Sequence, residues 1–185
     1  MISFGIQNDR PGASHRQDPR WYACYTRARH EKQVDRLLQQ RGVDSYLPLA
    51  SRRRQWKDRE KLVSFPLFPS YVFARFSLER LWTVVSIPGV ATVVRNNGSP
   101  VAITDAELEN VRRFAGVVSG SEVEAELVQL PERGERVRIT SGPFEGIQGM
   151  VAEQRGRRRI LIGLEAIGWG ILVEVEAAAL STLQS

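Results

Sequence analysis

The sequence predicts an α+β fold, an antiparallel sheet flanked by helices, followed by a small all-β barrel. Between residues 20 and 116, segments with helical and strand periodicity alternate without the spacing of a doubly wound parallel sheet. A stretch rich in Gly, Ser and Glu follows, and after Pro131 only strand patterns remain. We therefore expect four parts: a disordered leader (1–19), an N-terminal domain (20–116), a linker (117–130) and a barrel (131–182).

The first elements follow from composition and spacing. Residues 1–19 are polar, contain Pro and Gly, and lack the apolar core of a secretory signal. The apolar and aromatic run Trp21–Thr26 predicts a strand. A helix is expected over 31–41, because Val34, Leu37 and Leu38 have helical spacing and Gly42 suits a left-handed C-terminal cap.

Strands dominate the next stretch. Residues 43–49 return to a strand pattern, whereas 51–60 are too charged for a core element and indicate an exposed loop or a hairpin tip. Two further strands are predicted, Leu62–Phe65 and Ser70–Phe76, joined through Pro66 and Pro69.

Two more helices complete the N-terminal domain. Ser77 is a plausible N-cap for a helix that ends at Pro88-Gly89, with an inner face made of Leu78, Leu81, Trp82 and Val85. A strand over 90–95 and an Asn96-Asn97-Gly98 turn come next. Thr104 and Glu107 then have the spacing of a capping box, which opens a helix whose inward residues are Leu108, Val111 and Ala115.

The last part alternates apolar and polar residues in three runs, as expected of a small antiparallel barrel. Gly142, Gly146 and Gly149 permit turns and close strand crossings, and Phe144 between them would plug or abut the barrel. These glycines favour a structural barrel corner and not a phosphate loop, because no Lys-Ser or Lys-Thr follows them.

Charge is distributed unevenly along the chain. Residues 1–116 hold 19 Lys/Arg against 11 Asp/Glu, whereas residues 117–185 hold 7 against 10. The basic excess is concentrated between Arg27 and Lys61, which indicates that the first domain meets a polyanion such as nucleic acid. No apolar run is long enough to span a bilayer, and the single cysteine, Cys24, is typical of a reducing cytoplasm.

No residue pattern predicts an enzyme. The two histidines, His15 and His30, are isolated from each other, no Cys/His cluster has metal-ligand spacing, and Cys24 has no evident base partner. We therefore predict no catalytic residue, no metal site and no cofactor.

Two segments resemble known families. Gly134–Val151 resembles a KOW motif, the glycine-centred strand-loop-strand of bacterial transcription elongation factors and several ribosomal proteins. The earlier part is similar to the NusG N-terminal domain at Trp21-Tyr22, Arg27–Lys32, Tyr46-Leu47-Pro48, Leu67–Phe73, Pro88-Gly89-Val90 and Pro100–Ile103. In this order, over residues 20–182, these motifs identify the chain as a NusG-family transcription elongation or antitermination factor with an SH3-like KOW barrel, either the housekeeping factor or a specialised RfaH-like or UpxY-like paralog.

The resemblance implies a polymerase-binding surface. In that family the N-terminal domain binds the clamp helices of the largest RNA polymerase subunit, and the matching positions here are Tyr25, Phe68, Tyr71 and Phe73. Alternate residues of a strand share a face, so Tyr71 and Phe73 could together form an aromatic anchor. Packing in the core is the competing interpretation.

The resemblance also implies further partners for a cytoplasmic, monomeric protein without a membrane segment. Arg27, Arg29 and His30 match the family's surface near upstream or non-template DNA, and Arg52, Arg53 and Arg54 could extend it. Through Ile167 and Trp169 the KOW barrel could recruit the termination factor Rho or a small-subunit ribosomal protein. The alternative function is an RNA- or ribosome-binding KOW protein without polymerase activity.

Overall fold

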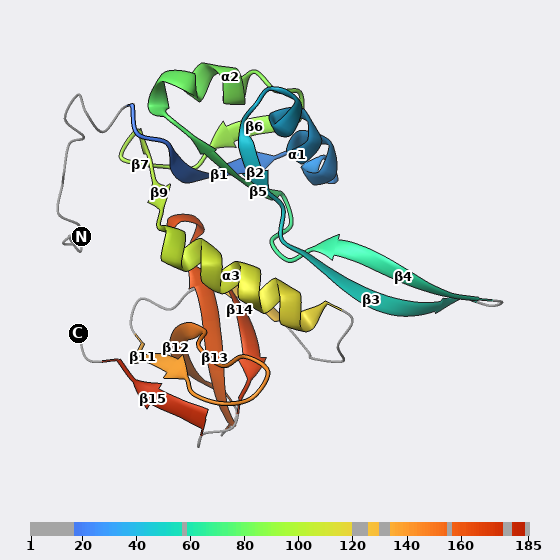
Figure 1. Cartoon of the computed structure of the whole chain (residues 1–185), viewed down its shortest axis with the longest axis vertical. Helices are drawn as coiled ribbons and strands as arrows, with labels where there is room; N and C mark the ends of the chain where they lie inside the picture. Colours follow the sequence, from blue (N-terminus) through green and yellow to red (C-terminus); the bar gives the residue numbers. More distant parts are fainter. Residues whose placement is uncertain are drawn as a thin grey trace.

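A computed structural model describes residues 17–56, 59–119, 126–129, 134–154, 157–175 and 179–183. Within these residues two antiparallel sheets stand on either side of the long helix α3 (Figure 1). The α+β class and the antiparallel sheets are as the sequence predicts. No helix in the described ranges is long and apolar enough to cross a membrane.

The N-terminal sheet has the order β2-β5-β1-β6, and β9 also pairs with β1. All of these pairings are antiparallel. A small ribbon, β7–β8, turns at Asn97 and Gly98, both with positive φ, as the Asn-Asn-Gly signal predicts. The strands are β1 (Arg20–Thr26), β2 (Asp44–Tyr46), β5 (Tyr71–Phe76), β6 (Val90–Val93), β7 (Arg95–Asn96), β8 (Ser99–Pro100) and β9 (Ala102–Ile103).

Each face of this sheet has its own core because side chains alternate along β1 and β5. One face packs under α1 (Glu31–Gln40) and α2 (Leu81–Val85), with Cys24 and Val72 fully buried. The other face carries Trp21 and Phe73 and packs against α3 (Asp105–Val118). The predicted capping box of α3 is confirmed, since Thr104 Oγ1 accepts from Glu107 N and Thr104 N donates to Glu107 Oε2.

A two-stranded hairpin projects from the body of the domain (Figure 1). It consists of β3 (Leu49–Trp56) and β4 (Arg59–Pro66), paired from Leu49↔Pro66 to Trp56↔Arg59. Of the two alternatives open for residues 51–60, the hairpin is therefore the one observed. The strand β4 is longer than the predicted strand 62–65, and the predicted strand 43–49 is divided into β2 and the first residue of β3.

The α2 segment corrects one prediction about side-chain orientation. A 3₁₀ turn, Leu78–Arg80, precedes α2, and the fully buried residue of the helix is Val84. Trp82, predicted on the inner face, is 79% exposed. The prediction was wrong because the segment changes from a 3₁₀ turn to an α-helix, so a single helical period does not describe it.

The second sheet, the barrel, has the order β10-β14-β13-β12-β11-β15. Gly149 lies where a Cβ would come within 2.6 Å of Ile160 Cγ2 and 2.7 Å of the Leu161 carbonyl oxygen, which explains the glycine at this crossing. Its strands are β10 (Glu126–Gln129), β11 (Arg136–Ile139), β12 (Gln148–Gln154), β13 (Arg157–Leu164), β14 (Trp169–Glu174) and β15 (Leu180–Thr182), with a 3₁₀ turn at Glu165–Ile167.

The predicted boundaries need two changes. The helix α3 continues to Val118, two residues beyond the predicted end of the domain, because Val118 is buried in the core. Residues 126–129, predicted as linker, form β10 and pair with β14 from Glu126↔Leu172 to Gln129↔Trp169. The leader residues 1–16 and the linker residues 120–125 lie outside the described residues.

The helix α3 also contacts the barrel. Phe114 of α3 stacks on Phe144, with ring centroids 5.5 Å apart and an interplanar angle of 16°. Nearby, Gln148 N donates a hydrogen bond to Asn110 Oδ1 at 3.3 Å. Phe144 is thus buried against the N-terminal domain, and one continuous hydrophobic core joins the sheet face, α3 and the barrel.

Candidate functional site

The Phe68–Tyr71 turn is fixed between β1 and α1. Ser70 has φ of 66°, a left-handed conformation that is unusual for a residue other than glycine. Its amide donates to Glu31 Oε1 at 2.8 Å, and its carbonyl oxygen accepts from Thr26 N at 2.8 Å. These two hydrogen bonds determine where Tyr71 enters β5.

Glu31 is a charged residue with only 7% exposure. It occupies the first position of α1, where the helix dipole stabilises a carboxylate, and the Ser70 amide satisfies one of its oxygens. Sequence reasoning missed this role of Glu31. The available signal was an acidic residue in the first turn of a predicted helix, which by itself indicates a helix start and no particular partner.

We expect Ser70→Gly to raise the free energy of unfolding by about 1 kcal/mol, because glycine adopts positive φ without the steric cost that serine has. Urea denaturation of the two proteins measures this difference. Gly42→Ala is the matched control, since Gly42 also has positive φ of 65° with open space around it and should lose a similar amount. A destabilised Ser70→Gly variant would show that the serine side chain matters more than its backbone conformation.

Tyr25 and Tyr71 form an exposed aromatic pair at one end of the sheet. Their ring centroids are 5.3 Å apart with an interplanar angle of 62°, and they face each other across β1 and β5 in register. Tyr25 is 42% exposed and Tyr71 is half-buried. Burial, and secondarily the neighbouring Tyr25, raise the pKa of Tyr71, so its hydroxyl stays protonated and can donate a hydrogen bond at neutral pH.

Phe68 and Phe73 belong to the core against which Tyr71 packs and are inaccessible. They are 1% and 0% exposed, and their rings meet edge to face with centroids 6.0 Å apart. For these two residues the core interpretation describes the structure, because α3 and its neighbours cover the sheet face that Phe73 shares with Tyr71. The four predicted residues therefore lie in one region, with Tyr25 and Tyr71 at the surface and Phe68 and Phe73 in the core behind Tyr71.

The predicted basic residues separate into two groups. Arg27 and Arg29 are exposed at the entry to α1, and His30 is half-buried, with Nδ1 3.0 Å from the carbonyl oxygen of Ala28. Arg53 is exposed on β3, in the projecting hairpin, and the side chains of Arg52 and Arg54 lie outside the described residues. Near its base the hairpin contacts α1, where Lys32 Nζ donates to the Ser64 carbonyl oxygen at 3.1 Å.

Ile167 and Trp169 are half-buried in the barrel and pack against its core. The 3₁₀ turn that holds Ile167 contacts β9 of the N-terminal domain. An ion pair next to it joins Arg136 Nη2 and Glu165 Oε1 at 2.5 Å. Ile167 and Trp169 are therefore partly exposed to solvent, and the turn that holds Ile167 lies against the N-terminal domain.

Comparison with known proteins gives consistent matches. A family model described as "Transcription termination factor nusG" matches residues 19–112, just over half of the 185-residue chain. The transcription termination/antitermination proteins NusG of Rickettsia bellii and Rickettsia prowazekii are 25% identical over 174 residues (88% of this chain, 89% of the relative) and 27% identical over 187 residues (95% of each). A solved structure on domain interaction in Thermotoga maritima NusG is 25% identical, covers 90% of this chain and 98% of its own, and has a TM-score of 0.51.

The matched part of the chain contains the whole N-terminal sheet, the tyrosine pair and the entry to α1. The relatives and the solved structure extend the similarity over nearly the full length, including the barrel. Among the described residues, no group of three or more His, Cys, Asp or Glu side chains could hold a metal ion. The chain belongs to the NusG family of non-enzymatic transcription termination and antitermination factors.

Proposed function

We propose that this protein binds transcribing RNA polymerase at the clamp helices of the largest subunit and suppresses pausing or premature termination. The observation that supports this most is the exposed Tyr25–Tyr71 pair, which lies inside the part of the chain that the family model matches. The protein would act in the cytoplasm as a monomer, bound to the polymerase through this surface.

The surroundings of the tyrosine pair suit an interface. Exposed tyrosines present a large apolar ring together with a hydroxyl, and such residues dominate the binding energy of many protein interfaces. Tyr71 packs against the core that contains Phe68 and Phe73 and contacts the ring of Tyr25, so less conformational entropy remains to be lost on binding than for a free surface side chain. The Glu31–Ser70 hydrogen bond adds to this preorganisation by fixing the turn before Tyr71.

The basic entry to α1 supports a DNA contact next to the polymerase. Arg27, Arg29 and His30 would contact phosphates of upstream or non-template DNA. Arg53, with Arg52 and Arg54, would extend this contact along the projecting hairpin. A long basic hairpin that leaves the body of the domain can reach along a nucleic acid without moving the sheet.

The barrel would recruit a second partner, Rho or a small-subunit ribosomal protein, through Ile167 and Trp169. Both residues keep part of their surface. Because the turn that holds Ile167 touches β9, complete access requires the barrel to move away from the N-terminal domain.

The test is co-purification with core RNA polymerase in the absence of nucleic acid. We expect the double variant Tyr25→Ala/Tyr71→Ala to lose at least tenfold in affinity, since aromatic hot-spot residues contribute about 2 kcal/mol or more each. Trp82→Ala is the matched control, because it removes an exposed aromatic ring on the other side of the sheet and should bind normally. Equal binding of the double variant and the parent would refute the assignment of this surface to polymerase binding.

A transcription assay across a pause site and a terminator then separates the two candidate functions. The proposed function requires that the parent protein increases read-through and that the double tyrosine variant does not increase it. An RNA- or ribosome-binding KOW protein would instead bind RNA without polymerase and leave read-through unchanged.

A further inference from the structure

A cavity of about 280 Å³ lies between the first turns of α3 and the barrel. From α3 it is lined by Ala106 and Asn110, and from the barrel by Met150, Leu161 and Leu183. Leu161 is buried, whereas Met150 and Leu183 are half-buried and Ala106 is exposed. The two domains thus share a hollow whose barrel side presents apolar side chains.

Glycines leave this cavity open. Gly149 and Gly163 of the barrel line it and contribute no side chain. At Gly149 a larger residue would not fit, because its Cβ would come within 2.6 Å of Ile160 Cγ2. Small-molecule pockets begin at about 300 Å³, so this cavity suits one or two side chains better than a larger molecule.

The charged residues that line the cavity already have partners. Arg136 forms an ion pair with Glu165. Glu107 accepts hydrogen bonds from Thr104 in the capping box of α3. An occupant therefore needs no charge of its own, and a neutral apolar segment suits the cavity better than an ion does.

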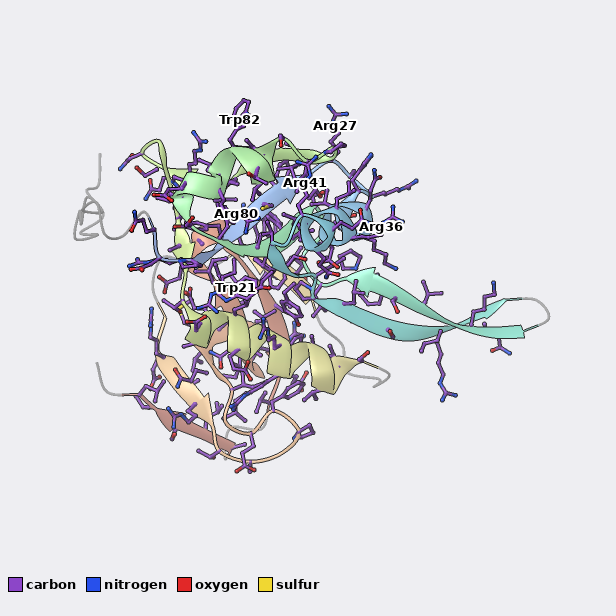
Figure 2. All side chains as sticks on the ribbon, turned by 45° about the horizontal axis from the view of Figure 1, so that its top comes forward. Trp21, Arg27, Arg36, Arg41, Arg80 and Trp82 are labelled. Carbon is purple, nitrogen blue, oxygen red and sulfur yellow. The ribbon has the colours of Figure 1, made fainter. Side chains whose placement is uncertain are left out.

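The chain enters β1 beside this cavity. Trp21 pairs with Ile103 across β1 and β9, and Thr104, the next residue, lines the cavity. Figure 2 shows Trp21 next to α3, where Arg112 Cζ lies 5.3 Å from the centroid of its ring. Tyr25 is four residues further along β1, about 13 Å away, so the exposed tyrosine pair lies at the other end of the strand. The residues that precede β1 therefore start near the cavity.

The leader has an apolar beginning and a polar remainder. Residues 1–8 contain no Asp, Glu, Lys or Arg, and their large apolar side chains are Met1, Ile2, Phe4 and Ile6. In an extended segment Ile2, Phe4 and Ile6 share one face. Residues 9–16 are mostly polar and include Pro and Gly, which is the composition of a linker. The leader thus resembles a short apolar ligand on a tether.

We propose that residues 2–6 of this chain bind in the cavity between α3 and the barrel, with Phe4 against Met150 and Leu183. The proposal is independent of polymerase binding, since it uses neither tyrosine of the exposed pair. It assigns a role to a segment that the proposed function does not use.

The tether makes this contact feasible without high affinity. As a linker, the roughly 13 residues from Gln7 to Pro19 have an average span of about 20 Å, and the cavity begins beside Ile103. Short linkers of this kind give effective concentrations in the millimolar range, so an intrinsic Kd of about 1 mM is enough for substantial occupancy. Because both domains line the cavity, the leader binds only when the barrel is docked on α3, and by linkage its binding favours docking.

The test is photo-crosslinking of the full-length protein, followed by mass spectrometry of the monomer band. The variant Phe4→p-benzoylphenylalanine keeps an aromatic ring at position 4, and we expect its crosslinks in the peptides that contain Ala106, Met150 or Leu183. The same photoreactive residue at Ala13, within the tether, should not favour these peptides. Crosslinks from position 4 that are absent, spread over the surface, or found around Trp82 on the opposite side of the N-terminal domain (Figure 2) would overturn the proposal.

A matched pair of substitutions on α3 tests the cavity itself. Ala106→Trp adds an indole at the cavity and should lower the yield of the crosslink to Met150 or Leu183 about tenfold, because the indole competes with the leader. Gly116→Trp is the control, since Gly116 lies near the other end of α3, is exposed and has open space around it. Equal yields in the two variants would refute the site. A crosslinked dimer in place of the monomer would assign the cavity to the leader of a second copy.

The dependence on both domains is tested with Phe144→Ala, which does not change a residue that lines the cavity. Where scattering shows that this variant separates the barrel from the N-terminal domain, the crosslink from position 4 should be lost. A crosslink that persists after separation would place the leader on one domain only and overturn the shared site. Polymerase co-purification is a separate measurement, because its failure would refute the proposed function and leave the crosslinking result unaffected.

Discussion

Phe73→Ala is expected to lower the free energy of unfolding by about 3–5 kcal/mol, the range for removing a fully buried phenylalanine ring. Phe73 is 0% exposed, meets Phe68 edge to face, and belongs to the core between the N-terminal sheet and α3. The cavity left by the ring would be lined by strands and a helix that cannot easily close it, so we expect the upper part of the range. Urea denaturation followed by far-ultraviolet circular dichroism measures the change.

Tyr25→Ala is the matched control for this prediction. Tyr25 is 42% exposed on the same face of the sheet, so its loss should cost about 1 kcal/mol or less. If Phe73→Ala were as stable as Tyr25→Ala, the packing of α3 against the sheet in solution would differ from the one described. A polymerase-binding experiment should therefore use the tyrosines, since an effect of Phe73→Ala on binding would report loss of the fold.

Local signals in the sequence predict much of the fold. The Thr104–Glu107 capping box, Gly42 after α1 and the Asn97-Gly98 turn each have a short-range physical cause, and each is found where the sequence indicates it. The KOW-like segment likewise becomes β11 and β12, because alternation and glycine spacing are local properties.

Features that depend on distant parts of the chain could not be predicted in this way. Alternation correctly places Tyr71 and Phe73 on one face, but the exposure of each depends on where α3 lies over that face. Strand β10 looks like linker because it is only four residues long and directly follows the Gly-, Ser- and Glu-rich stretch, and only its pairing with β14 makes it a strand. The Glu31–Ser70 bond joins residues 39 positions apart, and no local pattern reports it.

The same limit applies to Trp82. Its segment contains Leu81, Trp82 and Val85 at spacings that fit an inward helical face, and a tryptophan is usually buried. In the structure Val84 and Ile87 fill that role, and the indole is left outside. The sequence pattern predicts that Trp82 is buried, and the structure shows it exposed. Such a departure from a local pattern makes the residue a candidate for a functional role, because these departures are expected at functional sites.

Phe144→Ala is expected to separate the barrel from the N-terminal domain while both remain folded. Phe144 is buried and stacks on Phe114 of α3, and the hydrogen bond between Gln148 N and Asn110 Oδ1 nearby is long, at 3.3 Å. Interfaces between domains of one chain are weak unless they are large and hydrophobic, and Phe144 belongs to the hydrophobic core that α3 shares with the barrel, so its loss weakens the interface at that core. Losing about 3 kcal/mol from this contact would lower the equilibrium constant for docking of the barrel on the N-terminal domain roughly 100-fold.

Small-angle X-ray scattering measures the separation as an increase in the radius of gyration, with circular dichroism showing that the strands remain. Glu145→Ala is the matched control, because Glu145 is the exposed neighbour of Phe144 and should leave the scattering unchanged. Phe144→Leu, which keeps apolar bulk, should give an intermediate result. A scattering curve of Phe144→Ala identical to that of the parent would mean that the Phe114–Phe144 stack does not hold the two domains together.

Separation should also change the access to the barrel's predicted partner site. The turn with Ile167 touches β9, so it gains surface only if the barrel leaves the N-terminal domain. Trp169, half-buried two residues later, reports on this change through quenching of its fluorescence by iodide. In a Trp56→Phe/Trp82→Phe background, which keeps Trp169 and the buried Trp21 as the two remaining indoles, Phe144→Ala should increase the quenching. If the domains separate and quenching does not change, burial of Trp169 comes from the barrel alone, and a partner that binds there would have no reason to depend on the position of the N-terminal domain.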